Sequence, residues 1–363
     1  MESQVMILLL LALGIIGYLL SYLGVVALRH WAEKRHIIDI PNERSSHTRP
    51  IPRGGGLLIV LITLLGFLGA APLVQINLFE SGFITIGTGA ALIAIVSWYD
   101  DLGTTPCWIR FAAHAVGAIL VISFIGYGQS LTVPFLPSIN VGWPGILLAF
   151  LWLTGFTNAY NFMDGIDGIA GSQAVIAGVA WWGFGVLLGE PLLNLPGLFI
   201  AASSLGFLGH NWPPARIFMG DVGSAFLGFC LATLTLTSVH IDPRLPVAGV
   251  LIVWPFVFDT TFTILRRLQL GENIFAAHRS HLYQRLVIAG YSHQSVTLLY
   301  TGLSLIGVLV AYLWMLQVPS SDWLVILLPT INAIVLWYYV RHVETRTNKT
   351  HRIAHSIMHQ RDA

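Results

Sequence analysis

Charged side chains are scarce in this chain. Asp, Glu, Lys and Arg make up 10% of the 363 residues, whereas hydrophobic types make up 55%. A soluble domain carries about 25% charged residues. From Phe111 to Met163 there is no Asp, Glu, Lys or Arg at all. This composition excludes an ordinary soluble globular protein and indicates a polytopic membrane protein.

Cysteine and net charge are low as well. Cys107 and Cys230 fall in or beside apolar runs, which favours packing roles and gives no signal of a disulfide framework or a thiolate metal site. With a formal net charge of +1, the chain as a whole would not attract a polyanion. We therefore expect the lipid bilayer as a partner and no nucleic acid.

Apolar runs that could cross a bilayer recur along the chain. A spanning helix needs about 20 predominantly apolar residues, so the fold is predicted to be all-α and polytopic, with about 11 transmembrane helices (10–11). The weakest runs are 194–210 and 246–265, because Pro196, Pro255 and Asp259 interrupt them. The candidate spans are 5–28, 55–74, 81–98, 107–125, 143–160, 168–188, 194–210, 222–240, 246–265, 294–316 and 323–341.

The basic residues predict the orientation. With the N-terminus periplasmic and the C-terminus cytoplasmic, every Lys and Arg except Arg244 falls on the cytoplasmic side, as the positive-inside rule requires. We therefore predict a multi-pass protein of the bacterial inner membrane. Residues 1–341 would form an integral membrane domain with cytoplasmic catalytic loops, and 342–363 a cytoplasmic tail.

The segment 158–168 (NAYNFMDGIDG) brings two carboxylates to the edge of the predicted membrane. Asp164 and Asp167 stand at i, i+3 spacing, which places them on one helical face, and Asn158 and Asn161 repeat that spacing. An ionised group at this depth is costly and is rarely kept without a role. The glycine after each aspartate allows close backbone approach to a ligand. The alternative is a helix start with an aspartate as N-cap.

Two more acidic motifs fall on the same predicted side. Asp100 and Asp101 are adjacent, and Asp221 lies between Gly220 and Gly223. Clustered carboxylates suit Mg²⁺, with Mn²⁺ as the alternative, and such sites often use one or two protein carboxylates plus substrate phosphates. The alternatives are a solvated loop for the pair and an N-cap for Asp221.

Two basic segments complete the cytoplasmic chemistry. Residues 39–56 combine arginines with three consecutive glycines, a composition typical of phosphate binding. Residues 278–285 (HRSHLYQR) carry two histidines beside arginines, which suggests diphosphate contact. The candidate residues of these segments are Arg44, Arg49, Arg53, His278, Arg279, His281 and Arg285.

Taken in order, these five segments resemble those of the polyprenyl-phosphate N-acetylhexosamine-1-phosphate transferases (glycosyltransferase family 4), over residues from about 39 to 286. The most specific part is 158–168 followed by 218–224 at this spacing. The resemblance implies transfer of a sugar 1-phosphate from a UDP-N-acetylhexosamine to undecaprenyl phosphate, with release of UMP. The resemblance is also compatible with a homodimer.

The resemblance further implies residue roles. Asp221, with Asp100, would bind Mg²⁺. The catalytic set would be Asp100, Asp101, Asp164, Asp167, His278 and His281. The substrate-binding set would be Arg44, Arg49, Arg53, Asn158, Asn161, Asn211, Arg279 and Arg285.

The histidine segment also bears on the glycan. Related branches usually follow this loop with paired histidines, where this chain has Tyr283 and Gln284. The resemblance is therefore to the branch that initiates O-antigen, within lipopolysaccharide and cell-wall biogenesis. Its donors include UDP-N-acetylglucosamine and 6-deoxy relatives.

A different class of function competes with the transferase interpretation. An ion-coupled secondary transporter would also keep carboxylates in a membrane protein, but it would need them at mid-membrane. Only Asp259 falls within a predicted span, which favours the enzyme.

Overall fold

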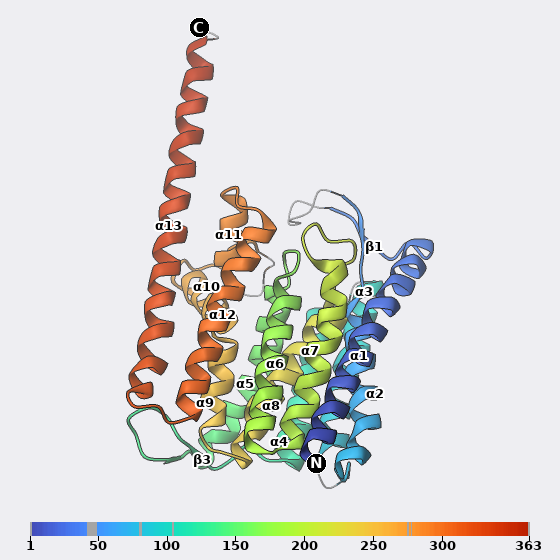
Figure 1. Cartoon of the computed structure of the whole chain (residues 1–363). Helices are drawn as coiled ribbons and strands as arrows, with labels where there is room; N and C mark the ends of the chain where they lie inside the picture. The colour runs from blue at the N-terminus through green and yellow to red at the C-terminus, as the bar shows by residue number, and fades with distance from the viewer. Residues whose placement is uncertain are drawn as a thin grey trace.

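The chain forms an elongated bundle of long helices with a short β-hairpin at each end (Figure 1). A computed structural model describes residues 2–41, 49–79, 82–103, 105–273, 276 and 278–361. The long helices are α1 (Glu2–Lys34), α2 (Gly56–Ala70), α3 (Phe83–Leu102), α4 (Cys107–Phe124), α5 (Pro144–Met163), α6 (Ile169–Leu188), α7 (Pro191–Asn211), α8 (Asp221–Thr237), α12 (His293–Met315) and α13 (Ser321–Arg361). The shorter elements are η1 (Ala71–Val74), η2 (Ser238–His240), α9 (Leu245–Ile252), α10 (Trp254–Gln269), α11 (Leu282–Ile288), and the hairpins β1 (Ile38–Asp39) with β2 (Ile51–Pro52) and β3 (Ser130–Leu131) with β4 (Ile139–Asn140).

The structure confirms an all-α polytopic membrane protein. Within the described residues, 10 helices are long and apolar enough to cross a membrane, or 11 if α9 and α10 together form one span. The predicted runs became helices because each supplies the roughly 20 apolar residues that a bilayer demands and pairs its backbone internally.

The predicted span 246–265 is not one straight helix. It divides at Val253 into α9 and α10, whose axes differ by 74°. Pro255 explains the break, because proline lacks an N–H and its ring clashes with the carbonyl four residues earlier. By contrast, Pro196 stays inside a continuous α7, near its start, where the loss of one hydrogen bond is tolerated.

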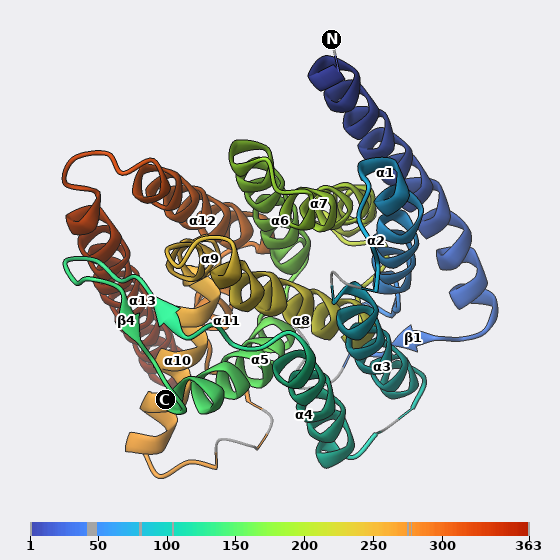
Figure 2. The same ribbon diagram turned by 90° about the horizontal axis from the view of Figure 1, so that it is seen from below.

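Helix α8 lies at the centre of the bundle, as the view along the helices shows (Figure 2). It is the most buried of the candidate spans and packs against α2, α3, α5 and α9. Its glycines, such as Gly223 against Gly56 and Gly228 against Thr157, permit this close packing. The first residue of α8, Asp221, is therefore held in a fixed position.

The two termini lie at opposite ends of the bundle, and the last turns of α13 extend beyond it (Figure 1). The candidate residues that the structure describes lie at the end from which α13 projects. That arrangement agrees with an odd number of crossings. The assignment of this end to the cytoplasm stays a prediction from the basic residues.

Candidate active site

Asp101 fixes the start of the central helix. Its Oδ1 accepts a hydrogen bond from the backbone N–H of Asp221 and its Oδ2 one from Val222, each at 3.0 Å. The carboxylate is buried and caps the positive end of the α8 dipole. Gly220, at φ +77°, leaves the space that this carboxylate occupies. Asp101 thus positions Asp221, and its oxygens are already engaged.

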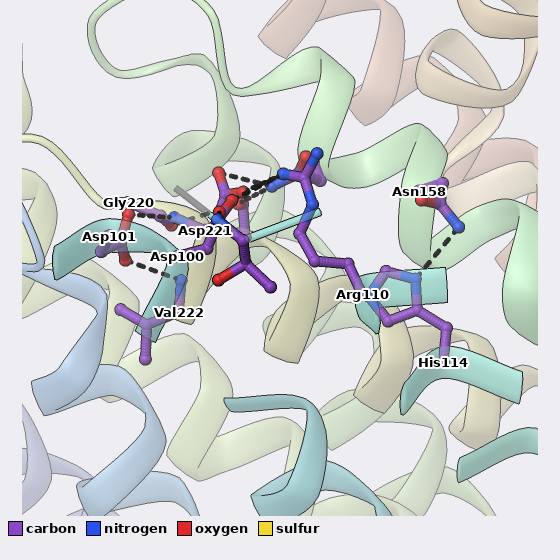
Figure 3. A network of polar contacts seen from close by, with 11 residues as sticks. Asp100, Asp101, Arg110, His114, Asn158, Gly220, Asp221 and Val222 are labelled. Carbon is purple, nitrogen blue, oxygen red and sulfur yellow. Dashed lines mark hydrogen bonds and ion pairs between the residues drawn. The ribbon is translucent and has the colours of Figure 1, made fainter. Parts of the chain in front are cut away.

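Asp100 and Asp221 face each other across an arginine (Figure 3). Nη1 of Arg110 donates to Oδ2 of Asp100 at 2.8 Å and to Oδ2 of Asp221 at 2.7 Å. The remaining oxygen of Asp100 accepts the Thr105 N–H at 2.7 Å, and that of Asp221 accepts Nδ2 of Asn161 at 3.0 Å. Helices α3, α4, α5 and α8 therefore meet in one charged cluster.

Asp164 stands beside this cluster with its carboxylate oxygens open. It ends α5 and accepts no hydrogen bond from the part of the chain that the structure describes. Burial, and then the charges of Asp221 and Asp101, raise the pKa of Asp164 well above its usual range. A carboxylate in such surroundings gains most from a bound cation.

Asp167 and Asn211 hold the turn that carries Asp164. Oδ2 of Asp167 accepts the N–H of Ala215 at 3.0 Å, and its Oδ1 lies 3.3 Å from Nδ1 of His293. Asn211 is buried, accepts the N–H of Gly168 and donates to a backbone carbonyl, each at 2.9 Å. Both side chains are engaged within the protein, which is the geometry of positioning residues. The catalytic role of Asp167 and the substrate-binding role of Asn211 stay predictions.

The histidine loop depends on Asp259. This fully buried carboxylate accepts Nδ1–H of His281 at 3.1 Å, the N–H groups of Leu282 and Tyr283 at 2.9 and 3.1 Å, and the hydroxyl of Tyr300 at 2.5 Å. It therefore caps α11 much as Asp101 caps α8. An acid engaged in this way has no oxygen left for ion coupling, which counts against the transporter interpretation.

His278 lies 5.1 Å from His281, measured between ring centroids. Its Nδ1 accepts from the backbone N–H and is 2.9 Å from the hydroxyl of Ser280. Burial, together with the nearby His281 and Arg267, lowers the pKa of His278 to about 4. The ring is therefore neutral at neutral pH, and it carries its proton on Nε2 because Nδ1 is an acceptor.

Tyr283 joins the histidine loop to the turn that contains Asp164. Its hydroxyl donates to the carbonyl of Phe162 at 2.9 Å and lies directly over Gly165. Tyr283 and Gln284 are both buried. They face the protein interior, so any effect on donor choice would pass through the shape of this loop.

Gly165→Ala is expected to displace this contact. A Cβ at Gly165 would overlap the Tyr283 hydroxyl, and such overpacking costs about 1–3 kcal/mol. Thermal unfolding in detergent should show a lower midpoint for Gly165→Ala. Gly155→Ala, in the preceding helix α5, is the control because no atom from outside its own stretch of helix lies within 4 Å of its added Cβ. Equal midpoints for the two variants would contradict this account.

The glycine-rich segment packs against the segment that leads into α8. Gly55 and Gly56 donate their N–H groups to the carbonyls of Phe218 and Met219, each at 2.9 Å. These amides are thus used internally rather than left open for a phosphate. Arg53 is half-buried and close enough to Asp101 for their charges to interact. Arg49 is exposed, and Arg44 lies outside the described residues.

The other predicted contacts are distributed differently. Arg285 forms a bidentate ion pair with Glu344 of α13, which ties α11 to the last helix. Its substrate contact stays a prediction. Asn158 forms a hydrogen bond of 3.1 Å with Nδ1 of His114 (Figure 3). His114 lies one turn after Arg110 on α4. Arg279 is half-buried in the histidine loop.

Two residues of this arrangement were not singled out from the sequence as site residues. In the sequence, Arg110 serves only to predict the topology, and Asp259 stands out only as the acid that interrupts a predicted span. The signal that could have found Arg110 is its position inside the predicted span 107–125, where an isolated cation needs a partner. Asp100, ten residues earlier, and Asp221 of α8 are those partners.

The carboxylates fit a Mg²⁺ site of the kind completed by substrate. In the described ranges, no group of three or more His, Cys, Asp or Glu residues is arranged to hold a metal ion unaided. Mg²⁺ usually keeps several waters and takes one or two carboxylates plus phosphate oxygens. Asp164 and Asp221 supply such a pair. The oxygens of Asp164 accept no hydrogen bond from the described residues, and the charge of Asp221 acts on the Asp164 carboxylate, so a cation between the two would relieve their repulsion.

The sequence is similar to those of known proteins over most of its length. The sequence profile of Glycosyl transferase family 4 matches residues 83–239, which include Asp100, Arg110, Asp164 and Asp221. A probable undecaprenyl-phosphate N-acetylglucosaminyl 1-phosphate transferase of Bacillus subtilis is 34% identical over 79% of this chain and 81% of the relative.

Two further relatives have the same breadth of match. A decaprenyl-phosphate N-acetylglucosaminephosphotransferase of Mycobacterium leprae is 29% identical over 79% of each chain. A phospho-N-acetylmuramoyl-pentapeptide-transferase of Listeria monocytogenes is 29% identical over 74% of this chain and 85% of the relative. With this profile match, identity and coverage, the chain belongs to glycosyl transferase family 4.

Proposed function

We propose that this protein transfers an N-acetylhexosamine 1-phosphate from a UDP-sugar to undecaprenyl phosphate and releases UMP, at the cytoplasmic face of the bacterial inner membrane. The observation that carries the proposal is the meeting of Asp100, Arg110, Asp164 and Asp221 at the ends of four membrane helices. The names of the relatives, which pair a polyprenyl phosphate with an amino sugar phosphate, support it.

The reaction forms one P–O bond and breaks another. An oxygen of the acceptor phosphate attacks the phosphorus next to the sugar, and the bond from that phosphorus to the UMP oxygen breaks. The second pKa of a phosphate monoester is about 6, so the acceptor is largely an anion at neutral pH. No aspartate has to remove a proton from it.

The barrier lies in bringing anions together, which is lowered mainly by positioning and charge neutralisation. Asp221 and Asp164 would hold Mg²⁺, which when bound neutralises phosphate charge. Asn161 orients Asp221, Asp101 fixes the helix end beneath it, and the neutral His278 can donate a hydrogen bond from its Nε2–H to a phosphate oxygen. These roles require no change in the protonation of the protein.

The glycan is the finer part of the proposal. We place the protein at the initiating step of O-antigen or a related cell-envelope glycan, with UDP-N-acetylglucosamine or a 6-deoxy relative as donor. The relatives named for N-acetylglucosamine support a UDP-N-acetylglucosamine donor. Tyr283 and Gln284, which stand where related branches have paired histidines, are buried. They would therefore influence the choice of sugar only indirectly, through the shape of the loop.

A direct assay tests the function. Purified protein in detergent would receive undecaprenyl phosphate, Mg²⁺ and a panel of UDP-N-acetylhexosamines, and UMP release and the lipid product would be measured. We expect release with one donor, dependent on the lipid, lost with a chelator and restored by Mg²⁺ or Mn²⁺. If no UMP is released with any donor, the transferase proposal is wrong and the transporter interpretation is favoured.

A further inference from the structure

Arg110 places its positive charge between two carboxylates that belong to different helices. A single nitrogen, Nη1, contacts Asp100 at 2.8 Å and Asp221 at 2.7 Å (Figure 3). Within the described residues, Arg110 is the only basic side chain paired with either aspartate. Without a cation here the two carboxylates would repel each other.

A divalent cation held by Asp221 and Asp164 would compete with this guanidinium for the Asp221 carboxylate. Mg²⁺ binds carboxylate oxygens at about 2.0–2.1 Å, which is closer than the nitrogen of Arg110 lies. The guanidinium and the metal therefore exclude each other by both volume and charge. Arginine cannot resolve this by losing its proton, because the guanidinium stays protonated in proteins. It has to move.

We infer that Arg110 is an internal counter-cation of the metal-free site and that a divalent cation held by Asp221 and Asp164 binds by displacing it from Asp221. The inference rests on the proposed function for the identity of the metal. The side chain of Arg110 is 33% exposed, so its guanidinium has a path toward solvent.

Displacement has a consequence for the substrate. A released guanidinium is a planar, permanently charged donor that suits phosphate oxygens. It would become available beside the metal when a phosphate-bearing ligand arrives. Without a metal, Arg110 would neutralise the carboxylates. With a metal bound, the released guanidinium would bind an anion.

Mn²⁺ binding, measured by electron paramagnetic resonance without nucleotide or lipid, tests the displacement. Arg110→Gln should bind Mn²⁺ about tenfold or more tightly than the unmodified protein, because a charge in contact with both carboxylates is removed. Arg216→Gln is the matched control, since Arg216 is exposed near the same end and pairs with no described carboxylate, and it should change affinity less than about twofold. Asp221→Asn should lose the binding.

Thermal unfolding provides a second measurement. Without divalent cations, Arg110→Gln should unfold at a lower temperature than the unmodified protein, since its carboxylates are uncompensated. Added Mg²⁺ should raise the midpoint of Arg110→Gln more than that of the unmodified protein. If Arg110→Gln is too unstable to purify, the same substitution in an Asp100→Asn background, compared with Asp100→Asn alone, should show the same tightening of Mn²⁺ binding.

The outcomes separate the two proposals. If Arg110→Gln binds Mn²⁺ no more tightly while Asp221→Asn abolishes binding, the displacement is wrong and the metal site stands. If Asp221→Asn binds Mn²⁺ normally, the proposed metal site is wrong and the displacement falls with it.

Discussion

Asp221→Asn is expected to abolish Mg²⁺-dependent UMP release, with a loss of at least about 10³-fold, larger than that for a single polar group at a transition state. Asparagine keeps the shape and can still accept from Asn161, and α8 stays in place because Asp101 still caps its first N–H groups. It lacks the charge that a metal ligand needs. The initial rate of UMP release with saturating lipid acceptor measures the effect.

Asp100→Asn is the comparison for that experiment. The Asp100 carboxylate is engaged by Thr105 and Arg110, and a phosphate acceptor needs no strong base. We therefore expect reduced but measurable turnover. A near-normal rate for Asp221→Asn would refute the assignment of Asp221 as the principal ligand, and total loss in Asp100→Asn would point to a base.

Asp259→Ala is expected to lower the free energy of unfolding by about 3–5 kcal/mol, the range for breaking a buried charged network. The variant would leave His281, two backbone N–H groups and the Tyr300 hydroxyl without an acceptor in a buried place, and unsatisfied buried donors are costly. Denaturant unfolding in mixed micelles measures the change.

Glu33→Gln is the control, because Glu33 is 48% exposed in a helical i, i+4 pair with Arg29 and should cost less than about 0.5 kcal/mol. Asp259→Ala should also lower turnover by loosening the histidine loop. An Asp259→Ala protein as stable as Glu33→Gln would show that the network does not hold α11. Ion-dependent stability tied to Asp259 would instead favour a transporter.

Asp101 and Asp259 illustrate how this fold uses buried aspartates. Each lies on one helix and caps the first N–H groups of another, α8 for Asp101 and α11 for Asp259. Each capped segment carries or adjoins a group of the site, Asp221 or His281. Aspartates of one chemical type therefore divide into those that hold helices and those, Asp164 and Asp221, that remain for a ligand.

The sequence alone determined the membrane helices and the end of the bundle that carries the chemistry. Spans of about 20 apolar residues can pair their backbone only within themselves, so their positions follow from local composition. The cost of charge in a bilayer confines the polar motifs to helix ends. Both constraints act within a short stretch of chain, which makes them readable residue by residue.

Only the tertiary structure decided which polar side chain meets which. Asp101 bonds to Val222, Arg110 to Asp221, and Arg285 to Glu344, and all three pairs join different helices. Adjacent aspartates such as Asp100 and Asp101 look alike in sequence, but they point in different directions from the end of α3. Their roles depend on helix packing, because a carboxylate binds whichever donors or cations the neighbouring helices bring within about 3 Å.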